Sequence, residues 1–498
     1  MYNPIGNRRK MESIDRLYKQ TRQAYSLKDL DQAIALYRDA LKLRPSGHVD
    51  HPSIFHKLAR CLVDRFLREH ESCDLDEAFT LVQQALELFP SEHPDRSSSL
   101  HTLARCLCEQ FKKDRKRSDL DGAIAAGREV LVLHPPGHPD RSSSLHSLSV
   151  FLRVQFIEDG RVEDLEEAIT LCRDAVDLRS PENPHRHLSL SNLAACLNDR
   201  YFQEHKVTDL DEAIAHESAA LDLRPPGHPD RSRSLHDLAL FLRNKFSVNR
   251  RMDDLERAIE ICRAAIDLRP PGDPDRHWSL SNLSCYLHDR FLTMHSTADL
   301  DEAITHARAA LDLRPLGHPA RVLTFRLLAI LLCSHFNKYG RTEDLKEAIS
   351  FVHAAIDLRS LGQPGWALVI NQLLIPLRKQ YSGRRAIVDL EEIITLGRAI
   401  LDLQPREHSG RDSSIESFEY DVMEMIDKLR SEMNLDKAIE LGREIMALRL
   451  PGDPGRSASL TKLIQCFEER FQKQGAISDL DELIMLHRDT LDLHPPGK

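Results

Sequence analysis

Residues 74–90 read DLDEAFTLVQQALELFP, and this stretch decides the fold. Its leucine, alanine, phenylalanine and valine residues recur at steps of three and four, which places them on one face of a helix. The carboxylate of Asp74 is predicted to cap the first turn, and Glu77 to complete a capping pair. Pro90 is predicted to end the helix. We name this segment helix B of a repeating unit.

The helix B pattern returns every 45 residues along the chain of 498 residues. The predicted starts of helix B are Asp29, Asp74, Asp119, Asp164, Asp209, Asp254, Asp299, Asp344, Asp389, Asn434 and Asp479. A fixed period of this length is typical of a solenoid built from stacked units. The sequence therefore predicts one elongated array.

A second apolar stripe precedes each helix B and predicts a helix A. Between Pro94 and Phe111, for example, Leu100, Ala104 and Leu107 fall on one face. Each unit is then a helical hairpin that buries its apolar faces only by stacking on its neighbours. In helix B the column that contains Ala213 and Ala258 is small where two helices are expected to approach closely.

A longer period of 90 residues lies on top of the first. The segment Ser-Leu-Ser-Asn-Leu at 189–193 returns at 279–283, and the segment at 151–156 is echoed at 241–246. Units therefore alternate in type, as duplication of pairs would produce.

These columns resemble the tetratricopeptide repeat, in an expanded form. The small residue of its helix A corresponds to Ala59, Ala104, Ala194, Ala239 and Ala329, and its helix B alanines correspond to Ala78 and Ala85. The resemblance implies an all-α fold, a right-handed α-solenoid (superhelix) of about eleven helix-turn-helix repeats over residues 11–498. Residues 1–10 are expected to be disordered, and residues 11–26 to cap the array. The amino-acid sequence of the repeat is also similar to that of fungal arrays that precede a caspase-like CHAT domain or belong to nucleotide-binding immune-type receptors.

The composition limits the kinds of partner and the compartment that we expect for this protein. A net charge of −10 argues against a nucleic-acid partner, because phosphate binding relies on excess lysine and arginine. No apolar run is long enough for a membrane span, and the first ten residues do not resemble a secretory signal, so we expect a cytoplasmic protein. Cysteines such as Cys61, Cys106 and Cys196 share one column of helix A and are predicted to be packing thiols.

The sequence offers no phosphate loop, HExxH or GxSxG motif, so we predict no catalytic residue, no cofactor and no metal. His93, His138 and His228 lie in turns one or more hairpins apart, too far for one ion, and are interpreted as structural residues at helix starts. An arginine column at the start of helix A is interpreted as a ladder that pairs with an acid of a neighbouring unit. Its members are Arg96, Arg141, Arg186, Arg231, Arg276, Arg321, Arg411 and Arg456.

The region from Gly362 to Ile426 departs most from the pattern. Trp366 replaces the column arginine, Pro376 lies inside a helix, and Glu419 and Asp421 occupy apolar columns. Drift of a weakly constrained unit, a bend of the array and a docked partner all remain open at this point.

The fold predicts a non-catalytic scaffold that binds a protein or peptide in a groove lined by helix A. The candidate partner-binding residues are His56, His101, His146, His236, Trp278 and Trp366. The alternative is the sensing arm of a larger effector whose effector domain is absent from this chain; an RNA-binding helical repeat is disfavoured by the acidic balance. Residues 479–493 lack a polar capping element, which predicts either end-to-end self-association or a missing C-terminal domain.

Overall fold

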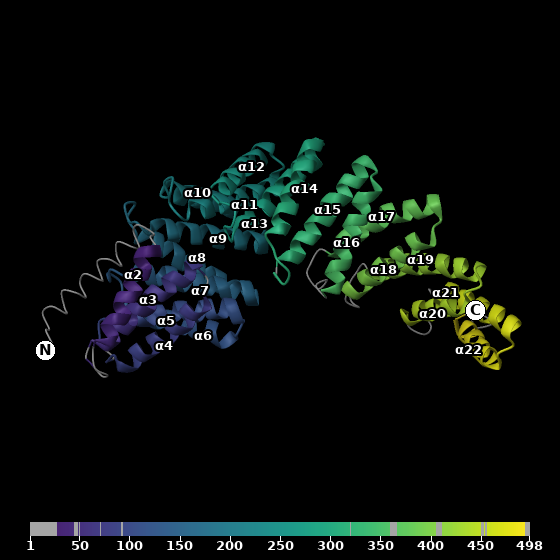
Figure 1. Cartoon of the computed structure of the whole chain (residues 1–498), viewed down its shortest axis with the longest axis horizontal. Coiled ribbons are helices and arrows are strands. Elements are labelled where there is room, and N and C mark those ends of the chain that lie inside the picture. Colours follow the sequence, from purple (N-terminus) through teal and green to yellow (C-terminus); the bar gives the residue numbers. More distant parts are fainter. Residues whose placement is uncertain are drawn as a thin grey trace. The chain divides into compact units, whose positions relative to one another are not determined.

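The computed structural model describes residues 27–43, 48, 50–69, 71–90, 93–318, 320–358, 366–404, 411–449, 453 and 456–493. Every regular element in these ranges is an α-helix (Figure 1). The predicted all-α helical-repeat solenoid is therefore confirmed. The expected disorder of residues 1–10 and the cap at residues 11–26 lie outside the described residues.

The chain divides into two units, Met1–Pro270 and Pro271–Lys498. The first unit holds helix α2 (Leu27–Lys42) and the hairpins α3 (His51–Glu69) with α4 (Ser72–Leu88), α5 (Arg96–Asp114) with α6 (Arg117–Leu133), α7 (Arg141–Asp159) with α8 (Val162–Asp177), α9 (Arg186–Glu204) with α10 (Val207–Asp222), and α11 (Arg231–Asn249) with α12 (Met252–Asp267). The second unit holds α13 (Arg276–Met294) with α14 (Thr297–Asp312), α15 (Arg321–Tyr339) with α16 (Thr342–Asp357), α17 (Trp366–Arg384) with α18 (Ile387–Leu403), α19 (Arg411–Ser431) with α20 (Leu435–Ala447), and α21 (Arg456–Gln474) with α22 (Ile477–Leu493).

Within each unit the hairpins stack in sequence order. In the first unit α3 packs on its own helix B, α4, and also on the next helix A, α5. In the second unit α13 contacts both α14 and α15 in the same way. The small column of helix B lies at the centre of this packing, because Ala78, Ala213 and Ala258 are each 0% exposed.

The acids of the DLDEA signature have roles that differ from the predicted cap. Helix α4 begins at Ser72, with Glu71 at the N-cap position, so the prediction that Asp74 caps the helix is wrong. The buried Asp74 carboxylate instead accepts two hydrogen bonds from helix A, from Arg65 Nε at 2.7 Å and Arg65 Nη2 at 2.6 Å. At Asn434 the predicted cap is confirmed, because its side chain accepts from the backbone N–H of Lys437.

The arginine of helix A joins neighbouring hairpins. Arg65 Nη1 also donates to Asp31 of the preceding unit at 2.8 Å. The same buried clamp recurs as Arg200 with Asp209, Arg290 with Asp299, and Arg470 with Asp479. Glu77, predicted to complete a capping box, pairs with Arg38 of the preceding helix B. The signature therefore encodes contacts within and between hairpins.

The arginine column at the start of helix A is structural, and six of its members donate to backbone carbonyls: Arg96, Arg141, Arg186, Arg231, Arg321 and Arg411. Arg96 Nη1 donates to the carbonyl of Leu86 at 3.2 Å, and Arg411 Nη1 donates to the carbonyl of Leu401 at 2.7 Å. Such carbonyls in the last turn of a helix lack a partner within the helix. The predicted pairing with a neighbouring acid is thus replaced by capping of the end of the preceding helix B.

The divergent region around α17 to α19 is internally compensated. Helix α17 continues through Pro376. The buried Glu419 accepts from Arg449 Nε at 2.8 Å, and the buried Asp421 accepts from Arg378 Nη2 at 2.6 Å. Each acid in these apolar columns is therefore paired with an arginine of the chain. The cysteines are free thiols, and Cys61, Cys106 and Cys196 are buried as predicted.

Candidate functional site

A groove of about 480 Å³ runs over successive helices A of the first unit, from α3 through α5 and α7 to α9. The residues that line it are mostly polar and include Arg60, Ser98, His101, Arg105, Glu109, Asp140, His146, Ser147, Val150, Arg179 and His185. Helix A supplies most of them because the 45-residue period brings one residue of each column to the same face. The predicted candidates His101 and His146 both lie in this groove.

Two of the predicted histidines connect one helix A to the next. His101 Nε2 lies 2.7 Å from Ser147 Oγ, and His56 Nε2 lies 3.2 Å from Ser98 Oγ. His56 is buried, and His101 and His236 are half-buried. The rings of His56 and His101 therefore help to hold neighbouring helices A together, in addition to any contact with a partner.

His146 is the second predicted histidine in the wall of the groove. Its Nδ1 is buried and has no hydrogen-bond partner among the residues that the structure describes. Burial, and then the charge of Arg179, lower the pKa of His146 to about 3. The ring is therefore neutral at physiological pH, and its Nδ1 is an unused polar atom in the wall of the groove.

Charged side chains of both signs line the groove. Three arginines, Arg60, Arg105 and Arg179, face two acids, Glu109 and Asp140. Arg105 is paired with Asp64 at 2.9 Å. Burial lowers the pKa of Arg179 to about 10, so this guanidinium still carries its charge at neutral pH.

The two tryptophans lie in different surroundings. Trp366 is 1% exposed, so it offers no surface to a partner, and we withdraw it as a contact residue. It occupies the position that holds an arginine at the start of helix A in other units, and there it is buried. Trp278 is 40% exposed, and the guanidinium carbon of Arg314 lies 5.0 Å from the centre of its ring.

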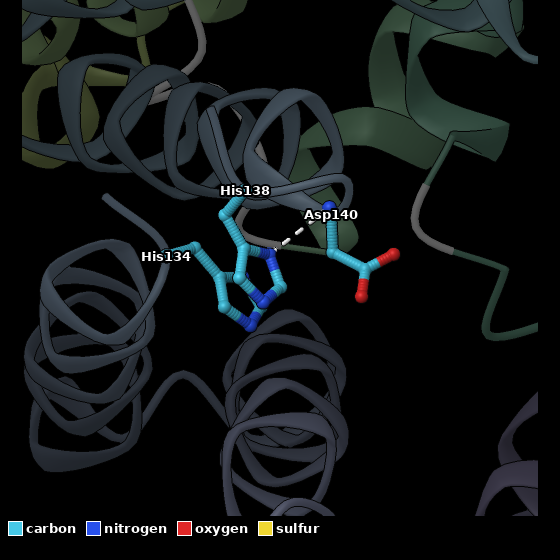
Figure 2. Close-up of side chains that lie close together, drawn as sticks. All are labelled: His134, His138 and Asp140. Carbon is cyan, nitrogen blue, oxygen red and sulfur yellow. Dashed lines mark hydrogen bonds between the residues drawn. The ribbon is translucent and has the colours of Figure 1, made fainter. Parts of the chain in front are cut away.

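Sequence reasoning missed a cluster of two histidines and an acid at the end of α6. His134, His138 and Asp140 place one potential metal-ligand atom each within 4.8 Å of one another. Figure 2 shows the two imidazole rings lying one over the other, with the Asp140 carboxylate directed away from them. The ring centres are 4.0 Å apart and the planes differ by 8°.

This geometry suits a stacked turn better than a chelate. His138 Nδ1 accepts the backbone N–H of Asp140 at 3.1 Å, and His134 Nδ1 shares a hydrogen bond with Ser144 Oγ at 2.7 Å. Only the Nε2 atoms remain, and in parallel rings their lone pairs run side by side. A metal ion at about 2.0–2.1 Å would need both in converging planes.

The preceding hairpin supports this interpretation of the cluster. Phe89 stacks on His93 with ring centres 4.2 Å apart, although phenylalanine cannot bind a metal. His93 Nδ1 also accepts the backbone N–H two residues later, at Asp95. The predicted structural role of the turn histidines is therefore confirmed. The sequence signal for His134 was its place in a column that holds arginine at 179, 224, 269 and 314.

The last helix, α22, exposes several apolar side chains. Leu480, Ile484, Met485 and Leu491 are exposed, whereas Leu483 and Leu486 are buried. Self-association through residues 479–493 stays a prediction. Within the described residues, no helix combines the length and apolarity needed to cross a bilayer.

The tetratricopeptide repeat family model matches residues 24–46. A Podosopora anserina kinesin light chain structure with nearly identical TPR-like repeats is 22% identical, covers 43% of this chain and 96% of that chain, and superposes with a TM-score of 0.32. Human IFIT1, as a dimer with m7Gppp-AAAA, is 15% identical, covers 94% of this chain and 87% of that chain, with a TM-score of 0.43. MamA is 18% identical, covers 40% of this chain and 92% of that chain, with a TM-score of 0.27. No curated protein matches the sequence.

The match to the repeat model, together with the stacked hairpins, confirms the tetratricopeptide resemblance predicted from the sequence. Repeats of this kind generally serve as scaffolds for protein interaction, and the chain has the architecture of such a scaffold.

Proposed function

We propose that this protein binds an extended segment of a partner protein in the groove over α3, α5, α7 and α9. The observation that carries the proposal is the continuity of the groove across four successive helices A. A chain laid along it would contact several repeats at once, and each repeat would add its own polar side chains. Sequence preference then comes from the order of these side chains along the array.

The chemistry of the walls favours an acidic, polar segment. Arg60 and Arg179 supply guanidinium groups, and His146 supplies a neutral ring nitrogen that can accept or donate. The half-buried Val150 gives a small apolar contact in the middle. If the array is the sensing arm of a larger effector, the same groove would be the sensing surface.

A peptide selection with a matched pair of variants tests the proposal. Short random peptides would be selected against the full chain and against Val150→Trp, which fills the groove. The control is Thr170→Trp, an exposed position on α8 outside the groove. Circular dichroism would establish that both variants are folded.

We expect selected peptides to be rich in aspartate and glutamate and to lose binding in Val150→Trp but not in Thr170→Trp. Their affinity should fall as salt is raised, because the attraction is between charges. Peptides that bind both variants equally well would overturn the assignment to this groove.

A further inference from the structure

The 90-residue period places two equivalent arginines, Arg224 and Arg314, just after helix B of alternate hairpins. Both are buried at the end of their helix, Arg224 in the first unit and Arg314 in the second. Their surroundings correspond residue by residue: His187 and Ser191 in the first copy occupy the positions of His277 and Ser281 in the second.

In the first copy the arginine has a buried carboxyl partner. Arg224 Nη1 lies 3.5 Å from Glu217 Oε1 and 2.9 Å from Ser191 Oγ. Ser191 Oγ in turn donates to Glu217 Oε1 at 3.1 Å. Arg224 Nε donates to His187 Nδ1 at 3.1 Å. One carboxyl group of α10 thus connects the arginine and the serine.

In the second copy the carboxyl group is missing, because Ala307 stands where Glu217 does. Arg314 Nη1 donates to the carbonyl of Ala320 at 3.2 Å and to Thr324 Oγ1. Its Nε and Nη2, Ser281 Oγ and His277 Nε2 are buried without a hydrogen-bond partner in the described part of the chain.

Four unsatisfied polar atoms on three equivalent residues are a costly arrangement. A buried donor without an acceptor loses its hydrogen bonds to water and gains none in return, and this penalty is larger when the donor is charged. Burial alone lowers the pKa of Arg314 to about 10, so the guanidinium is still charged at neutral pH. The second copy therefore keeps the arginine and the serine that contact the Glu217 carboxyl group in the first copy, and it lacks that carboxyl group.

Trp278 connects this buried cluster to the surface. It occupies the position of Leu188 in the first copy. Its ring packs over the guanidinium of Arg314, while 40% of the side chain is exposed to solvent. His277 lies beside it, with ring centres 5.1 Å apart, and the His318 ring packs edge-on against His277.

We infer that the cluster of Arg314, Ser281 and His277 binds a carboxylate from outside the chain, in the place that the Glu217 carboxyl group fills in the first copy. Two sources share this chemistry: an acidic side chain of a partner polypeptide, and a small free carboxylate. The site lies in the second unit and is independent of the groove proposed above.

Tryptophan fluorescence gives a direct readout, because the chain contains only two tryptophans. In a Trp366→Phe background, Trp278 is the single emitter. This protein would be titrated at constant ionic strength with sodium propionate and with a capped Gly-Glu-Gly tripeptide. The neutral controls are propionamide and the matching Gly-Gln-Gly tripeptide.

We expect a saturable change in Trp278 emission with the carboxylates and none with the amides. Tighter binding of the glutamyl tripeptide than of propionate would identify a polypeptide as the source, and the reverse order would identify a small carboxylate. No saturable change with either carboxylate would overturn the inference.

Two reciprocal substitutions locate the site. Ala307→Glu supplies the carboxyl group within the chain and should weaken propionate binding at least about tenfold. Glu217→Ala opens the equivalent site in the first copy, so propionate should raise the melting temperature of this variant more than that of the parent chain. Unchanged binding in a folded Ala307→Glu, or an equal thermal shift in Glu217→Ala and the parent, would contradict the assignment.

Discussion

The clamp between Arg200 and Asp209 gives the sharpest test of how the repeat signature works. Asp209 is the first acid of its DLDEA segment, and its carboxylate accepts from Arg200 Nε at 2.8 Å and Nη2 at 2.9 Å. These hydrogen bonds raise the pKa of the arginine. The perturbation is Asp209→Asn, which keeps the shape of the side chain and removes its charge.

The magnitude follows from burial. The side chains of Arg200 and Asp209 are 14% and 3% exposed. Breaking a fully buried pair costs about 3–5 kcal/mol. Arg200 keeps a second acid, Glu166, at 3.2 Å, so we expect a smaller loss of about 2–3 kcal/mol. The control is Glu212→Gln, whose pair with Arg173 is 48% and 50% exposed and should be worth at most about 1 kcal/mol.

The assay is urea denaturation followed by far-UV circular dichroism, with hydrogen exchange of the α9 and α10 amides as a local measure, because repeat arrays can unfold unit by unit. Arg200→Met combined with Asp209→Asn should recover about 1–3 kcal/mol relative to the sum of the single changes. If Asp209→Asn costs no more than Glu212→Gln, the clamp does not hold the hairpin together.

Three further outcomes are expected. A Cβ at Gly397 would lie 2.7 Å from Phe418 Cδ2, so Gly397→Ala should destabilise the protein by overpacking. A Cβ at Gly383 would have no neighbour within 4 Å, so Gly383→Ala should stabilise the helix by about 0.5–1 kcal/mol. Equal shifts in melting temperature for the two variants would refute this. Burial raises the pKa of Glu217 to about 7, so the folded state holds this proton more tightly and the unfolding free energy should fall as pH rises from about 4.5 to 7. That fall should be smaller in Glu217→Gln than in the Glu212→Gln control, as measured by urea melts at several pH values. The exposed Ile484 lies on α22, so Ile484→Glu should reduce the self-association of the protein measured by light scattering. A parent protein that is already monomeric would contradict the prediction.

The sequence was sufficient to predict the repeat and its core, because both depend on local periodicity. Columns such as that of Ala213 and Ala258 have a similar environment in most units, so a single pattern of small residues predicts their burial. The placement of His101 and His146 in one groove follows from the same spacing. The prediction and the structure agree for residues whose role is the same in successive units.

The roles of the charged residues could not be predicted in this way. In the sequence Asp74 has the position of a helix cap. In the structure α4 begins two residues earlier, and the carboxylate of Asp74 accepts a hydrogen bond from Arg65. Which arginine reaches which acid depends on how the helices of one hairpin rotate against each other, and spacing does not determine that rotation. Likewise, Arg314 lies next to a proline loop that suggests a surface, and only the folded structure encloses it.

Departures from the repeat fall into two physical classes. Glu419 and Asp421 insert acids into apolar columns, and each brings its own arginine, so these changes are complete within the chain. Around Arg314 the opposite holds, because its Nε and Nη2 have no hydrogen-bond partner among the described residues. Glu217 adds a carboxyl group beside Arg224 in a column that holds Cys172, Cys262 and Ala307 in nearby hairpins. Stability in an array is shared among many interfaces, so one unit can carry such a deficit without loss of the fold. On the inference that a carboxylate ligand satisfies this deficit, Arg314 has a binding role and the paired acids have a structural one.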